Sequence, residues 1–135
     1  MFFNYLFIVK GIIAAILGAL VGLERKTKHF GIGVRTSSLI ALSSCIFTLA
    51  GIAFFNETNI ARVVQGLAAG VGFIGAAVIW RQQTDHAWVK GLTTAVTIWF
   101  LTALGILVAL GFYLEGLLIT LLVLIILFLK RVGVE

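Results

Sequence analysis

Five apolar segments separated by short polar stretches follow one another along the 135-residue chain. They cover roughly Phe3–Leu23, Thr36–Phe55, Val63–Trp80, Gly91–Leu110 and Phe112–Lys130. A helix needs about 20 mostly apolar residues to cross about 30 Å of hydrocarbon, and each segment is close to that length. The pattern therefore predicts an all-α, polytopic bundle of about five transmembrane helices, with residues 1–135 forming a single domain.

The boundary between the fourth and fifth segments is the least distinct of the four. From Gly91 to Leu129 the only charged residue is Glu115, so the two segments are nearly fused. We place the turn at Gly111, because glycine is a strong local breaker and a charge follows shortly after it. Four spans with one re-entrant segment are the alternative.

Composition excludes a soluble protein. Hydrophobic residues make up 61% of the chain and charged residues only 11%, whereas an average soluble domain has about 25% charged residues. The net charge of +5 could indicate nucleic acid as a partner. The basic residues instead lie at the ends of apolar segments, where they orient a protein in the bilayer, so we expect no nucleic-acid partner.

The distribution of Lys and Arg predicts the topology. Eight of the ten basic residues lie on one side of the predicted bundle: Arg25, Lys26, Lys28, Arg35, Arg81, Lys90, Lys130 and Arg131. The positive-inside rule then places the N-terminus outside and the C-terminus in the cytoplasm, as an odd number of spans requires. Trp80 and Trp88 flank one of the predicted cytoplasmic loops, at the level of an interfacial aromatic belt.

Small residues recur at helical spacing in the first, second and fourth segments and are most frequent in the third, and transmembrane helices approach closely over such residues. The sets are Gly11, Ala15, Gly18 and Gly22; Ser37, Ala41, Ser44 and Thr48; Gly66, Ala69, Gly70, Gly72, Gly75, Ala76 and Ala77; and Ala95, Thr102, Gly105 and Ala109. We expect hydroxyls of the second set to bond across helices. The glycines of the third segment predict that this helix lies at the centre of the bundle or at a homo-oligomer interface. The Leu/Ile-rich fifth segment should face lipid.

The run Gly70-Val-Gly72-Phe-Ile-Gly75 matches the dinucleotide-binding pattern G-x-G-x-x-G literally. That motif works only between a strand and a helix, with an acidic residue about 20 positions further on. Here the run lies inside an apolar segment, and the next acid, Asp85, comes too soon. We therefore interpret it as a helix contact or a locally unwound segment.

No catalytic motif is present. The sequence contains no metalloprotease, P-loop or nucleophile-elbow pattern, so we expect neither an enzyme nor a cofactor. His29 and His86 are isolated in separate predicted loops, and the adjacent pair Asp85-His86 is far from a complete coordination shell. We expect no metal site.

Ionisable residues near the apolar segments are the best candidates for a functional site. Lys10 lies inside the first segment, where a charge is costly unless it has a function, finds a partner or snorkels. Glu115 falls on the same predicted side and could approach Lys10 or Arg62. At the other side Glu24 ends the first segment and Arg35 precedes the second, so the two could pair at the interface.

Four linked motifs together resemble the membrane domain of the MgtC/SapB family over roughly residues 17–113. In chain order they are Gly18-Ala-Leu-Val-Gly22-Leu-Glu24-Arg25; Gly33-Val-Arg35-Thr36; Gly66 with Gly70-Val-Gly72-Phe-Ile-Gly75-Ala76; and Gly91-Leu-Thr93-Thr94-Ala95 with Trp99. The resemblance adds Arg25, Thr36, Thr93 and Thr94 to the candidate site residues.

The resemblance implies a multi-pass protein of the bacterial inner membrane. The family is associated with growth under magnesium limitation and, in pathogens, with survival inside host cells. Two differences are visible. Ser37 follows Arg35-Thr36 where the family usually has a histidine, and better-known members carry a soluble C-terminal domain, whereas this sequence ends at Glu135.

Two functions are consistent with these features. One is a non-enzymatic membrane protein that contacts a second copy or another membrane protein through its small-residue faces and serves adaptation to magnesium limitation or stress. The alternative is a small oligomeric ion transporter or channel, which Lys10, Glu115 and the glycine-rich third segment favour. Apart from the lipid bilayer, the expected partners are therefore proteins.

Overall fold

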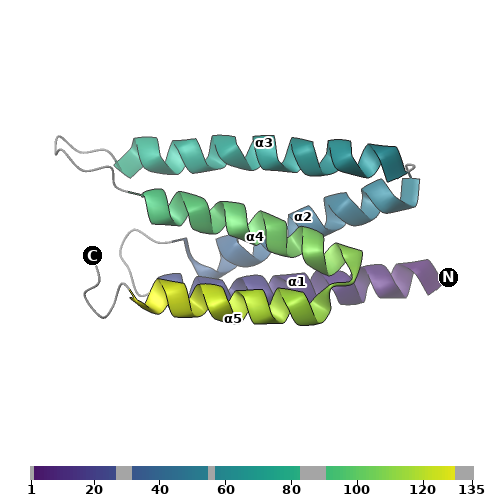
Figure 1. The fold of residues 1–135 in the computed structure, drawn as a ribbon, viewed down its shortest axis with the longest axis horizontal. Coiled ribbons are helices and arrows are strands. Elements are labelled where there is room, and N and C mark those ends of the chain that lie inside the picture. The colour runs from purple at the N-terminus through teal and green to yellow at the C-terminus, as the bar shows by residue number, and fades with distance from the viewer. Residues whose placement is uncertain (1, 27–31, 55–56, 83–90, 130–135) are drawn as a thin grey trace.

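The structure is a computed structural model that describes residues 2–26, 32–54, 57–82 and 91–129. It consists of five helices: α1 (Phe2–Lys26), α2 (Val34–Phe54), α3 (Glu57–Gln82), α4 (Leu92–Leu110) and α5 (Tyr113–Leu129). The helices lie side by side as one elongated bundle, and α1 begins at the opposite end from that where α5 finishes (Figure 1). No strand occurs in these four ranges. The predicted all-α bundle is confirmed.

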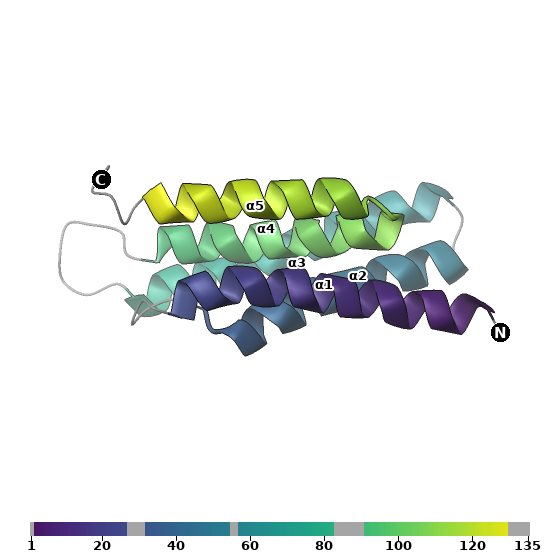
Figure 2. The same cartoon turned by 90° about the horizontal axis from the view of Figure 1, so that it is seen from below.

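Four of the helices are long and apolar enough to cross a membrane, and α5 is shorter, with 17 residues. At 1.5 Å per residue α5 is about 26 Å long, at the lower end of the range for a span. It runs back beside α4 along the bundle (Figure 2) and also contacts α1. The predicted separation of the last two apolar segments is confirmed, because α4 and α5 are distinct antiparallel helices.

The turn between α4 and α5 lies where the sequence predicts it. Gly111 has φ 94°, a left-handed conformation that glycine adopts without steric cost. Its N–H donates to the Val108 carbonyl at 3.1 Å, and the N–H of Phe112 donates to the Leu107 carbonyl at 3.0 Å. These bonds close the C-terminus of α4 in the manner of a Schellman motif.

The α1–α2 contact rests on the glycines of α1. A Cβ built on Gly18 would lie 2.7 Å from the Ser37 carbonyl oxygen, and one on Gly22 would lie 2.7 Å from the Val34 Cα. No side chain larger than hydrogen fits at such distances, so the two backbones approach as closely as glycine permits. The predicted small-residue face of the first span is confirmed.

The centre of the bundle is formed by α2 and α4. A Cβ on Gly105 of α4 would overlap the hydroxyl of Ser44 and the carbonyl of Ala41 in α2. The predicted bonding of α2 hydroxyls across helices is wrong for two of them, because Ser44 Oγ donates to the Ala41 carbonyl and Thr48 Oγ1 to the Ser44 carbonyl. Both bonds stay within α2, a common solution for buried Ser and Thr in helices.

The third helix lies at the edge of the bundle. Only 11% of the α3 span is buried, against 50% of the α4 span. Figure 1 shows α3 along one side, with α2 and α4 next to it and α1 and α5 beyond them. The predicted central position of this helix is therefore wrong. Three of its glycines, Gly66, Gly70 and Gly72, have no neighbouring atom within 4 Å of a built Cβ, so they do not mark close packing inside the bundle.

The fifth helix faces outward over most of its surface, as predicted. Its buried residues are Gly116, Thr120 and Leu127, which form one narrow stripe towards the bundle. Its Leu and Ile side chains elsewhere are exposed, as lipid-facing residues should be. At the end of α3, Trp80 is 82% exposed, consistent with its predicted interfacial position. Trp88 lies outside the described residues.

Candidate functional site

The most buried charge of the described residues lies where α1 ends and α4 begins. Arg25 is only 4% exposed, and its Nη2 donates a hydrogen bond of 2.8 Å to Thr94 Oγ1. Arg25 belongs to the last turn of α1, where the helix dipole favours a positive charge. Thr94 belongs to the first turn of α4 and is itself 4% exposed. We call these two residues the α1–α4 junction.

Within the described ranges, Arg25 Nε and Ser37 Oγ are buried without a hydrogen-bond partner. The Ser37 side chain packs against Gly22, one turn before Arg25. Ser37 stands where the family pattern usually has a histidine, so this departure from the pattern lies at the α1–α2 contact. A buried charge with few bonds is costly, and the junction is therefore sensitive to substitution.

The other residues predicted for this cluster lie nearer the surface. Arg35 and Thr36 are exposed at the start of α2, and Glu24 is partly buried at the end of α1. Pairing of Glu24 with Arg35 stays a prediction. Arg25, another member of the cluster, donates its hydrogen bond to Thr94 of α4. The neighbouring candidate Thr93 is exposed, and its carbonyl accepts a bond of 2.7 Å from Thr97 Oγ1.

Lys10 has a defined partner at the opposite end of the bundle. Its Nζ donates a hydrogen bond of 2.6 Å to the carbonyl of Ala109, in the last turn of α4. The last carbonyls of a helix have no partner within the helix, and a cation there also complements the dipole. Lys10 is therefore a cap for α4. Glu115 and Arg62 are exposed, and no ion pair joins either of them to Lys10 in the described ranges.

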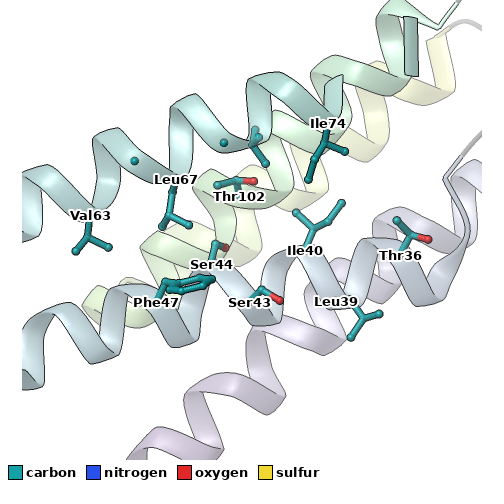
Figure 3. Close-up of a pocket in the computed structure, with 13 residues that line it drawn as sticks. Thr36, Leu39, Ile40, Ser43, Ser44, Phe47, Val63, Leu67, Ile74 and Thr102 are labelled. Carbon is teal, nitrogen blue, oxygen red and sulfur yellow. The ribbon is translucent and has the colours of Figure 1, made fainter. Parts of the chain in front are cut away.

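An open groove of about 700 Å³ separates α3 from α2. Val63, Leu67 and Ile74 of α3 face Ile40 and Phe47 of α2 across it, and Thr102 of α4 lies behind them (Figure 3). Its polar lining consists of Ser and Thr hydroxyls, with no ionisable side chain among the described residues. Thr36 lines one end, next to the exposed Arg35. We call this feature the α2–α3 groove.

The four glycines predicted in α3 have three different environments. Gly66 and Gly70 line the α2–α3 groove, and a Cβ on either would meet no atom within 4 Å. Gly75 packs on α4, since its Cβ would lie 3.5 Å from Ala95 Cβ. Gly72 is exposed and also meets nothing within 4 Å. All lie in continuous helix, so the G-x-G-x-x-G run forms no phosphate-binding turn.

A second surface of α3 faces away from the bundle. Gln65, Ala69, Gly72 and Ala76 are spaced by four, three and four residues, which places them on one helix face. All four are exposed, and none lines the groove. We call this surface the outer face of α3. Gln65 is not among the candidates predicted from the sequence, although an amide at helical spacing with small residues is a recognisable signal for interhelical contact.

No metal-binding group is formed by the described residues. Among them no three His, Cys, Asp or Glu side chains lie close enough to hold an ion. His29, Asp85 and His86 lie outside the described ranges. Cys45 is buried in α2 as a free thiol.

The fold and these contacts define a multi-pass helical membrane protein whose polar groups join helix ends. The family model for the MgtC family matches residues 12–134. The chain belongs to the MgtC family. The motifs from which the resemblance was inferred lie within that range, and the α1–α4 junction links the first of them to the last.

Named relatives from three bacteria are similar to this chain. Protein SapB of Bacillus subtilis is 38% identical over 112 residues, which cover 77% of this chain and 47% of SapB. Protein SrpB of Synechococcus elongatus is 37% identical over 117 residues, covering 78% and 64%. Protein MgtC of Salmonella typhimurium is 33% identical over 118 residues, covering 87% and 49%.

The matched region spans roughly half to two thirds of each of these relatives. No solved structure gives a significant match.

Proposed function

We propose that this protein is a non-enzymatic component of the bacterial inner membrane that acts by binding a transmembrane helix of a protein partner. The outer face of α3 is the binding surface. The family resemblance supplies the physiological context, which is adaptation to magnesium limitation or related stress. A second copy of the chain and another membrane protein both present such a helix.

The exposure of Gln65 together with Ala69, Gly72 and Ala76 is the observation that supports this proposal most directly. An amide turned towards hydrocarbon costs free energy unless it finds a hydrogen-bond partner. A neighbouring helix can supply that partner, and the small residues beside Gln65 let its backbone approach closely. Lipid chains can do neither, so the face is better suited to a helix than to the bilayer.

One of the residues that favour ion transport in the sequence, Lys10, has a capping role in the bundle. Lys10 caps α4 through the Ala109 carbonyl, so its charge serves a structural bond. The α2–α3 groove is lined by apolar side chains and hydroxyls. An ion path of the usual kind needs charged rings or converging carbonyls. Partner binding therefore accounts for more of the observed geometry than transport does.

Growth at low magnesium of a strain that lacks the protein tests this proposal. We expect Gly72→Leu and Gln65→Leu to abolish complementation while membrane level and thermal stability stay at wild type, because neither side chain packs inside the bundle. Leu122→Ala on the lipid-facing side of α5 is the control and should complement fully. Full complementation by both α3 variants would contradict the proposal.

Ion flux separates the two functions. Liposomes that contain only this protein should show the same flux as empty liposomes. Flux above that background, removed by a substitution in the bundle, would favour the transporter instead.

A further inference from the structure

We propose that the α2–α3 groove is a binding site for an anionic phospholipid, which inserts one acyl chain between the helices and places its phosphate at Arg35. This site is separate from the outer face of α3, and the inference does not depend on the proposed partner. It assigns a ligand to a groove of about 700 Å³ that the proposed function does not use.

The lining of the groove matches an acyl chain. Apolar side chains of both helices dominate it, and the backbone of Gly66 and Gly70 is uncovered along the α3 wall. Leu39 and Phe47 on the α2 side are 59% and 60% exposed, so the groove opens sideways to the bilayer and a lipid can enter without unfolding the bundle. Hydrocarbon is the medium there, and a chain seated in the groove would restore packing contacts that the open walls lack.

The shape of the groove suits an acyl chain. From Thr36 to Phe47 the wall of α2 advances by eleven residue steps, about 16 Å at 1.5 Å per residue. An extended hydrocarbon chain is much thinner than a helix with its side chains, which is about 10–12 Å wide, and it can lie lengthwise along this wall.

The charge at one end of the groove selects the head group. Thr36 lines that end with its hydroxyl, and the residue before it in the chain is the exposed, basic Arg35. Guanidinium binds phosphate through charge-assisted, bidentate hydrogen bonds. The positive-inside pattern predicts that this end faces the cytoplasm, where the anionic lipids of the inner leaflet attract basic residues.

Native mass spectrometry of the delipidated full chain tests the site. The probes are phosphatidylglycerol and phosphatidylcholine with identical acyl chains, titrated separately. Wild type should bind one phosphatidylglycerol in preference to phosphatidylcholine. Gly70→Leu should weaken binding of both lipids at least about tenfold, because the leucine side chain takes the place of several methylene groups in the groove. The open space around Gly70 allows this variant to fold.

Three further variants make the result specific. Gly66→Leu, also in open space on the groove wall, should reproduce the loss. Ala61→Leu on the same helix is exposed, lies outside the groove lining and should bind like wild type. Arg35→Gln should keep chain binding but lose about fivefold in the preference for phosphatidylglycerol.

Unchanged lipid binding in folded Gly66→Leu and Gly70→Leu variants would overturn the site. Equal binding of the two lipids by wild type would overturn the head-group assignment. A protein dimer that Gly70→Leu dissociates without changing bound lipid would identify the occupant as a second copy and so also overturn the inference.

Discussion

Arg25 and Thr94 are 69 positions apart in sequence, yet their side chains form a buried hydrogen bond of 2.8 Å between the end of α1 and the beginning of α4. Thr94 supplies the Arg25 guanidinium with an acceptor that lipid or apolar side chains could not replace. The bond therefore fixes the position of the end of α1 relative to the start of α4.

Removal of the Thr94 hydroxyl should destabilise the protein. Thr94→Val keeps the side-chain shape but leaves a buried Nη2 without its acceptor, and we expect a loss of about 1–2 kcal/mol in the free energy of unfolding. Thermal unfolding in detergent measures this. Thr93→Val is the matched control, because Thr93 is exposed and the bond from Thr97 goes to its backbone carbonyl. Equal stability of the two variants would contradict the assigned role of the junction.

Lys10→Met should loosen the C-terminal turn of α4 without affecting the rest of the bundle. Methionine keeps the length of the side chain but cannot donate to the Ala109 carbonyl or complement the helix dipole, a loss of about 1 kcal/mol. Hydrogen exchange followed by mass spectrometry should show faster exchange around residues 109–113 only. If wild type and Lys10→Met exchanged at the same rate around residues 109–113, Lys10 would not cap this helix.

Gly105 and Gly116 should respond differently to the same substitution. Gly105→Ala places a methyl group on the Ser44 hydroxyl and the Ala41 carbonyl, and we expect a cost of about 1–3 kcal/mol or more as α2 and α4 separate. Gly116→Ala meets Leu104 at an ordinary 3.6 Å and should be tolerated. Thermal stability of the two purified variants is the measurement. A stable Gly105→Ala protein would mean that α2 and α4 do not pack as the structure shows.

Topology can be checked with an impermeant thiol reagent. In a Cys45→Ser background, Lys28→Cys should be protected in intact cells and labelled after lysis, because the basic loops are predicted to be cytoplasmic. Labelling of Lys28→Cys in intact cells would reverse the orientation. Lys28 lies outside the described residues, so this prediction rests on the distribution of charge alone.

Features of the fold that depend on a few neighbouring residues could be predicted from the sequence. Apolar length indicated the helices, the glycine at position 111 indicated the turn, and the spacing of Gly18 and Gly22 indicated a face of α1 suited to close helix packing. Each of these follows from a few neighbouring residues. The same reasoning placed α3 either at the centre of the bundle or at a homo-oligomer interface, because small residues mark both internal contacts and exposed faces. Spacing alone does not distinguish the two.

Contacts between distant residues could not be predicted in this way. The family motifs marked Arg25 and Thr94 as separate candidates, but nothing in either motif says that they meet. Lys10 had three open interpretations, and only the structure shows that the Ala109 carbonyl is its partner. Gln65 was overlooked because a single amide in an apolar segment becomes informative only when its exposure is known.

Binding of a partner helix at the outer face of α3 is tested most directly by cross-linking in living cells. A photo-reactive amino acid in place of Gly72 should give a discrete protein adduct that disappears when Gln65→Leu is added. The adduct mass shows whether the partner is a second 14.6 kDa copy or another protein. The same group in place of Leu122 on α5 should give no such band. Identical results at both positions, or an adduct unaffected by Gln65→Leu, would contradict binding at this face.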